Sequence, residues 1–200
     1  MAPAGRVEAI VTGAATHSTL STRCVDTGPD GDYNPAMMLA DVVSSPQAAE
    51  PKHKVTSANG PAVYKNFPSE QLKTVEARDP DFTVVFTEDK NGFYINGKKF
   101  AMGSAPMVRA PVGSMQHWRV VNATREVHPF HIHQVHFLAY AINGVASEMP
   151  EWLDTVNVPY GGTVDLIMDF TDPVIRGVSV FHCHLLSHED KGMMAKIVFE

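Results

Sequence analysis

The sequence predicts an all-β protein whose main domain is a β-sandwich. From Asp81 to Glu200, short segments rich in β-branched and aromatic residues follow one another, separated by turn residues at close intervals. No stretch has the convincing apolar periodicity that an amphipathic helix requires. Glycine and proline occur 14 times each, which suits a loop-rich sandwich better than a helical protein.

The strands of this domain are predicted from alternation and from turn chemistry. Residues 82–86 alternate, and Asn96-Gly97 is a strong hairpin signal between residues 93–95 and 98–101. Further strands are predicted at residues 106–109, 117–122, 132–140, 155–158, 163–170, 178–184 and 195–199.

The residues before Asp81 predict an incomplete domain followed by a linker. Strands are predicted at residues 6–12, 18–25 and 37–43. A sandwich needs about seven strands in about 100 residues, so residues 1–45 are interpreted as the end of a domain that begins elsewhere. Residues 46–80 are polar, irregular and rich in proline, which predicts a long linker. Residues 81–200 then form the complete C-terminal domain.

Composition argues against some partners. The net charge of -6 gives no support for nucleic acid or an anionic membrane as a partner. No apolar run approaches the length that spans a bilayer.

One stretch, residues 181–193, concentrates metal-binding side chains: three imidazoles, one thiol and one thioether. Successive side chains of a strand point to opposite faces, so Cys183 is expected on one face and its neighbours His182 and His184 on the other. One strand would therefore serve two metal sites.

After a predicted turn, His188 and Met193 follow Cys183 at equal intervals. A thiolate, imidazoles and a weak axial methionine are the ligands of a blue-copper electron-transfer site. Spacing favours Met193 over Met194 as the axial ligand, and Met194 is expected to point into the core.

A second cluster upstream supplies the missing imidazoles. His131 and His133 are two residues apart and share a strand face, in a strand expected to run on to Tyr140. Pro129 is expected to break the strand register, so that His128 points elsewhere. The histidines then divide into a blue-copper set (His128, Cys183, His188, Met193) and a set of four imidazoles for a second centre (His131, His133, His182, His184).

These two motifs, H-P-x-H-x-H and H-C-H-x3-H-x3-G-M, resemble the C-terminal copper motifs of the multicopper oxidases, the laccase family. The resemblance covers residues 81–200 and extends weakly to residues 1–43, which look like the end of the family's middle cupredoxin domain. It implies a cupredoxin-like Greek-key sandwich. It also implies copper ligands: His128, Cys183, His188 and Met193 for type 1 copper, His131 for type 2 copper, and His133, His182 and His184 for the type 3 pair.

The resemblance further implies an activity. A small reductant would be oxidised at type 1 copper, and Cys183 with its two histidine neighbours would carry electrons to a trinuclear cluster that reduces oxygen to water. Glu189 resembles the family's acidic proton donor to that cluster. The family's cluster also needs paired H-x-H motifs from an N-terminal cupredoxin domain, which is therefore an implied partner. Family members of this kind are expected in the periplasm or outside the cell.

Three alternatives stay open at this point. Cysteine and histidine also bind zinc, although zinc has no need of Met193 and leaves four further imidazoles unexplained. The chain could be a single type 1 copper electron-transfer protein without oxidase activity. It could also be an inert piece of a longer protein.

Overall fold

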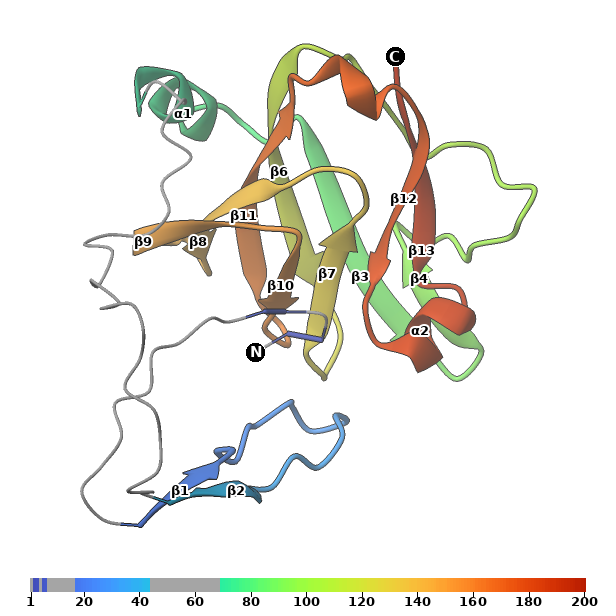
Figure 1. Ribbon diagram of the computed structural model, residues 1–200. Coiled ribbons are helices and arrows are strands. Elements are labelled where there is room, and N and C mark those ends of the chain that lie inside the picture. The colour runs from blue at the N-terminus through green and yellow to red at the C-terminus, as the bar shows by residue number, and fades with distance from the viewer. Residues whose placement is uncertain (1, 4, 7–16, 44–68) are drawn as a thin grey trace.

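Two β-sheets pack into a sandwich in the computed structural model, which describes residues 2–3, 5–6, 17–43 and 69–200 (Figure 1). Its strands are β3 (Phe82–Asp89), β4 (Gly92–Ile95), β5 (Val108–Ala110), β6 (Ser114–Asn122), β7 (His128–Ile132), β8 (Phe137–Ile142), β9 (Val145–Leu153), β10 (Thr155–Val158), β11 (Thr163–Phe170), β12 (Gly177–Cys183) and β13 (Met194–Phe199). One sheet has the order β4-β3-β6-β11-β8-β9, and the other has the order β10-β7-β12-β13-β5. The predicted all-β sandwich is confirmed.

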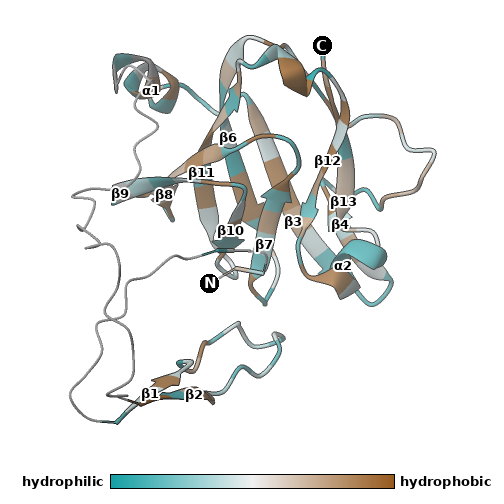
Figure 2. Cartoon of the chain, in the orientation of Figure 1, coloured by the Kyte–Doolittle hydropathy of each residue, from teal (hydrophilic) through white to brown (hydrophobic). Residues whose placement is uncertain are grey.

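Large aromatic side chains from both sheets form the core. Trp118 and Phe86 of one sheet and Phe130 and Phe181 of the other are each 0% exposed. The rings of Trp118 and Phe181 meet edge to face, with centroids 5.6 Å apart and planes inclined by 79°. Hydrophobic residues concentrate along the strands of the sandwich (Figure 2). Cys183 belongs to the same buried cluster, so one predicted metal ligand lies within the core.

One predicted strand, residues 132–140, is wrong because the structure has two strands there. Residues 132–140 divide between β7 and β8, which lie in different sheets. The chain changes direction near Gln134, whose φ of 72° is incompatible with a continuing strand. The predicted register break at Pro129 is also wrong, because β7 pairs with β10 without interruption from Val158↔His128 to Thr155↔His131.

Two other departures have local causes. Asn96 and Gly97 both have positive φ, at 50° and 69°, as a tight hairpin turn requires. The strand predicted at residues 98–101 is nevertheless reduced to the single bridge Ile95↔Lys98. The strand β9 is not predicted because Pro150 interrupts its pattern. β9 is the edge of its sheet, where a residue without an N–H is tolerated.

A short helix, α1 (Ser69–Glu76), lies inside the predicted linker. The expectation of irregular structure is therefore wrong for these residues. Val75 is 7% exposed and packs with Leu72 against Leu138 and Ile167, so α1 covers the outer face of the six-stranded sheet (Figure 1). The remaining helical elements are η1 (Pro173–Ile175) and α2 (Leu186–Asp190). Among the described residues, no helix is long and apolar enough to cross a membrane.

The N-terminal part forms an antiparallel hairpin of β1 (Ser18–Ser21) and β2 (Met38–Val42). Residues 7–12 of the first predicted strand lie outside the described residues. Between β1 and β2, the chain packs on the turn that precedes β7: Val127 N–H donates to Thr27 O at 2.8 Å, and Arg125 pairs with Asp30 at 2.9 Å. The division of the chain at residues 45 and 80 stays a prediction.

Candidate metal centre

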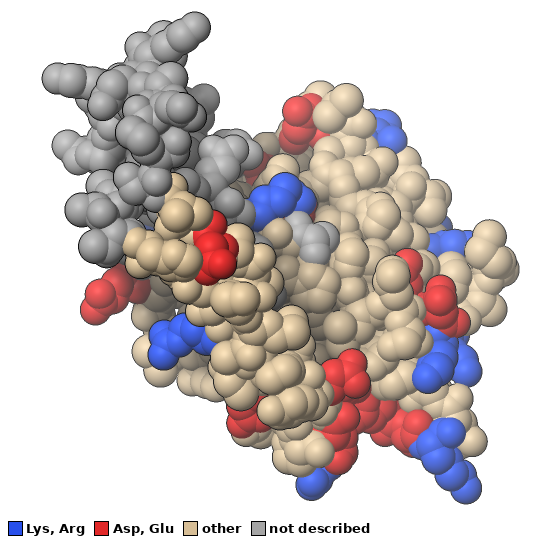
Figure 3. Space-filling view, turned by 60° about the horizontal axis from the view of Figure 1, so that its bottom comes forward, with Lys and Arg blue, Asp and Glu red and all other residues tan. Residues whose placement is uncertain are grey.

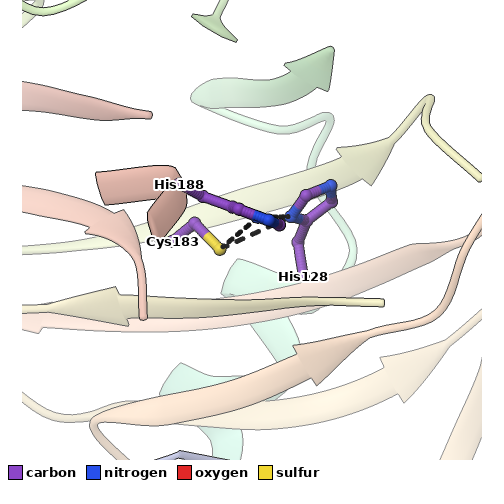
Figure 4. A group of neighbouring side chains, drawn as sticks. All are labelled: His128, Cys183 and His188. Atoms are coloured by element: carbon purple, nitrogen blue, oxygen red, sulfur yellow. Dashed lines mark hydrogen bonds between the residues drawn. The ribbon is translucent and has the colours of Figure 1, made fainter. Parts of the chain in front are cut away.

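Three ligand atoms from β7, β12 and α2 converge inside one end of the sandwich. His128 Nδ1 lies 3.4 Å from Cys183 Sγ and 3.2 Å from His188 Nδ1, and the sulfur lies 3.9 Å from His188 Nδ1 (Figure 4). The point equidistant from these three atoms is about 2.0 Å from each, close to the bond lengths of metal–imidazole and metal–thiolate ligands. The three side chains are 0%, 0% and 8% exposed. The structure thus brings together three of the four predicted type 1 ligands in a geometry that fits a metal ion.

Strand alternation positions these ligands. On β7, His128 and Phe130 face the core, whereas His131 lies on the opposite face because it is three residues from His128. The same rule holds on β12, where Cys183 is buried and His182 lies on the other face, against His133. The division of each cluster between two faces therefore stands, although its predicted cause at Pro129 does not.

Burial favours neutral imidazoles and a protonated thiol at this site. It lowers the pKa of His128 to about 3, with a smaller contribution from His188. It also lowers the pKa of His188 to about 4, with nearby Lys191 acting in the same direction. The imidazoles thus offer lone pairs at neutral pH. Burial raises the pKa of the Cys183 thiol to about 12, so a metal cation has to displace that proton.

Met193 returns to the same buried cluster after α2. It follows Gly192, which has a left-handed φ of 112°, and its side chain is 0% exposed. Its carbonyl accepts a hydrogen bond from Cys183 N–H at 3.1 Å, which ties it to the end of β12. Met194 is only half-buried, on the other face of β13. The expectation that Met194 points into the core is wrong, because alternation on β13 assigns the inner face to Met193 and Ala195.

The other four histidines form a second group on the outer face of the five-stranded sheet. The centroid of the His131 ring lies 5.0, 5.2 and 5.1 Å from the ring centroids of His133, His182 and His184, respectively. His133 Nε2 lies 3.0 Å from His182 Nε2. Ligand atoms of His131, His133 and His182 are close enough together to hold a metal ion. All four residues predicted for the second centre are therefore neighbours.

Hydrogen bonds at Nδ1 orient two of these rings. His131 Nδ1 lies 2.8 Å from the carbonyl of Asp154, and His182 Nδ1 lies 2.9 Å from the carbonyl of Cys183. A carbonyl only accepts, so both Nδ1 atoms donate and both Nε2 lone pairs are left for a ligand. Burial also lowers the pKa of both imidazoles to about 4. Glu189 Oε2 lies 3.3 Å from His182 Nδ1, so the predicted acidic residue contacts one member of the group.

One buried nitrogen supports the fit to a metal ion. His184 Nδ1 is buried and has no hydrogen-bond partner among the described residues. Leaving such an atom without a partner costs about 1–3 kcal/mol. One donor set combines sulfur with two nitrogens and the other offers imidazole nitrogens alone, and copper accepts both kinds of ligand.

Sequence reasoning missed three side chains that contact the first group. The ring of Phe93 stacks on His188 with centroids 3.9 Å apart at 14°. Glu126 Oε1 and Glu88 Oε2 lie near the outer nitrogens of His188 and His128. Glu126 could have been found from its place two residues before His128. Glu88 and Phe93 carry no such signal, because strand pairing alone brings them to the site.

The fold and the sulfur–imidazole site together define a metal-binding β-sandwich protein. A family model described as multicopper oxidase matches residues 66–200. The chain belongs to the multicopper oxidase family, as the two histidine motifs predicted, and membership of this family implies copper.

Individual relatives agree with this assignment. A laccase of Bacillus subtilis is 26% identical over 97% of this chain and 41% of its own length. A bilirubin oxidase of Albifimbria verrucaria is 30% identical over 84% of this chain and 29% of its own length. The crystal structure of a multicopper oxidase from Pediococcus acidilactici is 31% identical, with a TM-score of 0.55 over 85% of this chain and 32% of that one. The chain thus spans well under half the length of these relatives.

Proposed function

We propose that this chain is the C-terminal copper-binding portion of a laccase-like multicopper oxidase. The oxidase would take electrons from a small reductant on the type 1 side and use them to reduce oxygen to water at a trinuclear cluster. Residues 81–200 would be the copper-binding cupredoxin domain, residues 46–80 a linker and residues 1–45 the end of a middle domain. The observation that carries the proposal is the convergence of His128 Nδ1, Cys183 Sγ and His188 Nδ1 beside a separate group of four imidazoles.

Each group has a distinct role in this proposal. His128, Cys183 and His188 would hold type 1 copper, with Met193 as the long axial ligand. His131 would bind type 2 copper, and the other three outer histidines (His133, His182, His184) would bind the type 3 pair. Copper supplies reversible one-electron chemistry when bound.

The covalent chain links the two groups. Cys183 is bonded through the backbone to His182 on one side and His184 on the other. The hydrogen bond from His182 Nδ1 to the Cys183 carbonyl adds a second connection of 2.9 Å. The contact between Glu189 and His182 supports a role for Glu189 in holding a proton next to the imidazole group.

The imidazole group is only half of the proposed trinuclear site. This chain supplies four histidines to the proposed site. The relatives are more than twice as long as this chain, so a complete protein could supply further ligands from another domain. We therefore propose an N-terminal cupredoxin domain with paired H-x-H motifs as the partner, together with a small reductant and oxygen.

Copper loading tests the proposal against its alternatives. The chain is expected to bind copper at the first group and turn intensely blue, and Cys183→Ser is expected to abolish the colour while leaving the histidines of the second group in place. Oxygen uptake is expected only after a polypeptide with paired histidines is supplied. A colourless product that prefers zinc would refute the type 1 assignment, and a blue protein that never consumes oxygen with such a partner would favour the simple electron-transfer alternative.

A further inference from the structure

Two carboxylates cover the outer edges of both imidazoles of the first group. Glu126 Oε1 lies 3.3 Å from His188 Nε2 and 4.0 Å from His128 Nε2. Glu88 Oε2 lies 3.7 Å from His128 Nε2. Each ring therefore has its Nδ1 atom at the sulfur and its Nε2 atom at a carboxylate.

The carboxylates lie between the imidazoles and solvent. The Glu126 and Glu88 side chains are 12% and 22% exposed, and the His128 side chain is 0% exposed. His128 Nε2 is buried and has no hydrogen-bond partner among the described atoms. The two carboxylates lie 3.7 and 4.0 Å from this nitrogen, so a small side-chain movement would let one of them accept a hydrogen bond from His128 Nε2–H.

The backbone of Glu126 is fixed by two buried polar side chains. Asn122 Nδ2 donates to the Glu126 carbonyl at 2.8 Å, and Thr124 Oγ1 donates to it at 3.1 Å. Asn122 is 0% exposed and Thr124 is 6% exposed. Glu126 lies in the bend two residues before β7, and its carboxylate reaches the imidazoles from there. The carboxylate is therefore held in place by the same turn that begins β7.

The charge around Glu126 is strongly negative. Burial raises the pKa of Glu126 to about 7, and the neighbouring Glu88, Asp32 and Asp30 act in the same direction. Figure 3 turns the lower end of the sandwich forward, and acidic side chains gather along the lower part of that view. A carboxylate kept in such surroundings is not explained by stabilisation of the fold alone.

We propose that Glu126, supported by Glu88, is a positioning residue for both type 1 imidazoles. It accepts the Nε2 proton of His188, lies with Glu88 beside the Nε2 atom of His128, and so holds both Nδ1 atoms toward Cys183. Carboxylates that bind the second nitrogen of a ligating histidine fix its tautomer and raise its basicity. When ionised, the carboxylate would stabilise the more oxidised state of a bound metal and lower its reduction potential, so the potential is measured above pH 8. This inference rests on the proposed function.

Two substitutions separate geometry from charge. Glu126→Gln keeps an oxygen that accepts a hydrogen bond but removes the charge, whereas Glu126→Leu removes both at similar size. Glu126→Leu is expected to lower copper affinity about tenfold to a hundredfold. Glu126→Gln is expected to keep the affinity within a few-fold and to raise the potential, changing the oxidised-to-reduced ratio about tenfold at a fixed poise. Glu151→Gln, at an exposed position on the distant edge strand β9, is the control for the loss of one charge.

A measurement on the metal-free chain keeps this inference separate from the proposed function. Nitrogen chemical shifts of the His188 ring report which nitrogen carries the proton. The proton is expected on Nε2 in the wild type and in Glu126→Gln, and this preference is expected to disappear in Glu126→Leu. Amide spectra of each variant check that it is folded.

The outcomes are decisive for each idea. If both Glu126 variants match Glu151→Gln in affinity, potential and ring tautomer, Glu126 has no positioning role. If the wild type binds no copper, the proposed function is refuted, and the tautomer measurement still decides whether Glu126 orients His188.

Discussion

Metal uptake by the first group is expected to release one proton at neutral pH. At pH 7 an imidazole whose pKa is about 4, as for His188, is protonated in roughly one molecule in a thousand, and that of His128 in fewer still. The Cys183 thiol, with its pKa of about 12, is protonated in almost every molecule. Among the ligands, binding therefore displaces the sulfur proton alone. Glu126, whose pKa burial raises to about 7, can release a further fraction of a proton, so the ligand count is taken in a Glu126→Gln chain.

The pH dependence has a definite sign. Because one proton leaves with each metal ion, the apparent affinity is expected to rise about tenfold per pH unit between pH 6 and 9. Toward pH 4 the imidazoles become protonated as well, so the number of released protons rises above one and the affinity falls more steeply. Both limits follow from burial, which shifts imidazole and thiol pKa values in opposite directions.

Calorimetry with Cd²⁺ measures the number of protons released on metal binding, and it avoids redox chemistry at the thiol. Titrations in buffers of different ionisation enthalpy give the number of protons released. A chain carrying His131→Ala and His133→Ala silences the second group, so that the count belongs to the first. In the Glu126→Gln background, a release of two or more protons at pH 7 would show that the imidazoles are charged in the metal-free protein and would refute the reasoning.

Three further predictions concern the scaffold. Asn122→Ala removes a 0% exposed side chain that donates to two backbone carbonyls, and it is expected to lower the free energy of unfolding of the metal-free chain by about 2–4 kcal/mol in urea denaturation. Asp165→Asn removes a buried carboxylate that Arg119 contacts at 2.7 Å and His117 at 3.2 Å, with an expected cost of about 3–5 kcal/mol by the same assay. Gly28→Ala places a methyl group against the carbonyl of Arg125 at a left-handed φ of 102°, so faster proteolysis is expected between β1 and β2.

Matched controls keep these predictions specific. Asn91→Ala and Asp172→Asn alter exposed turn residues and are expected to change the free energy of unfolding by less than about 0.5 kcal/mol. Gly97→Ala also adds a methyl group at a left-handed φ, of 69°, but meets open space, so its segment should show a smaller increase in cleavage rate than that of Gly28→Ala. A variant that matches its control would contradict the corresponding prediction.

The division of these side chains into two groups could be predicted from the sequence because it depends on local geometry. The alternation that separates Cys183 from His182 is a property of any strand and needs no knowledge of the partner strands. The same local rule separates His128 from His131, although the sequence suggested a register break at Pro129 that the uninterrupted pairing with β10 contradicts. The roles of the individual ligands remain predictions.

Features that depend on which strands meet could not be predicted. Glu88 ends β3 and Glu126 precedes β7, and only the assembled sandwich brings them together over the imidazoles. The turn at Gln134 was missed because glutamine rarely adopts a left-handed backbone conformation, so the residue type gives no signal for it. The strand β9 was missed because Pro150 is tolerated only at a sheet edge, and edge position is itself a property of the finished topology.

Three consecutive residues at the end of β12 and directly after it, His182, Cys183 and His184, belong alternately to the two groups of side chains. The loop before β12 can change in length without altering the spacing of the groups, whereas the segment after it carries His184, His188 and Met193. A single inserted or deleted residue inside β12 would instead exchange the faces, directing sulfur at the outer imidazoles and an imidazole into the core. The relative placement of the two groups is therefore fixed by the alternation of adjacent side chains at the end of β12.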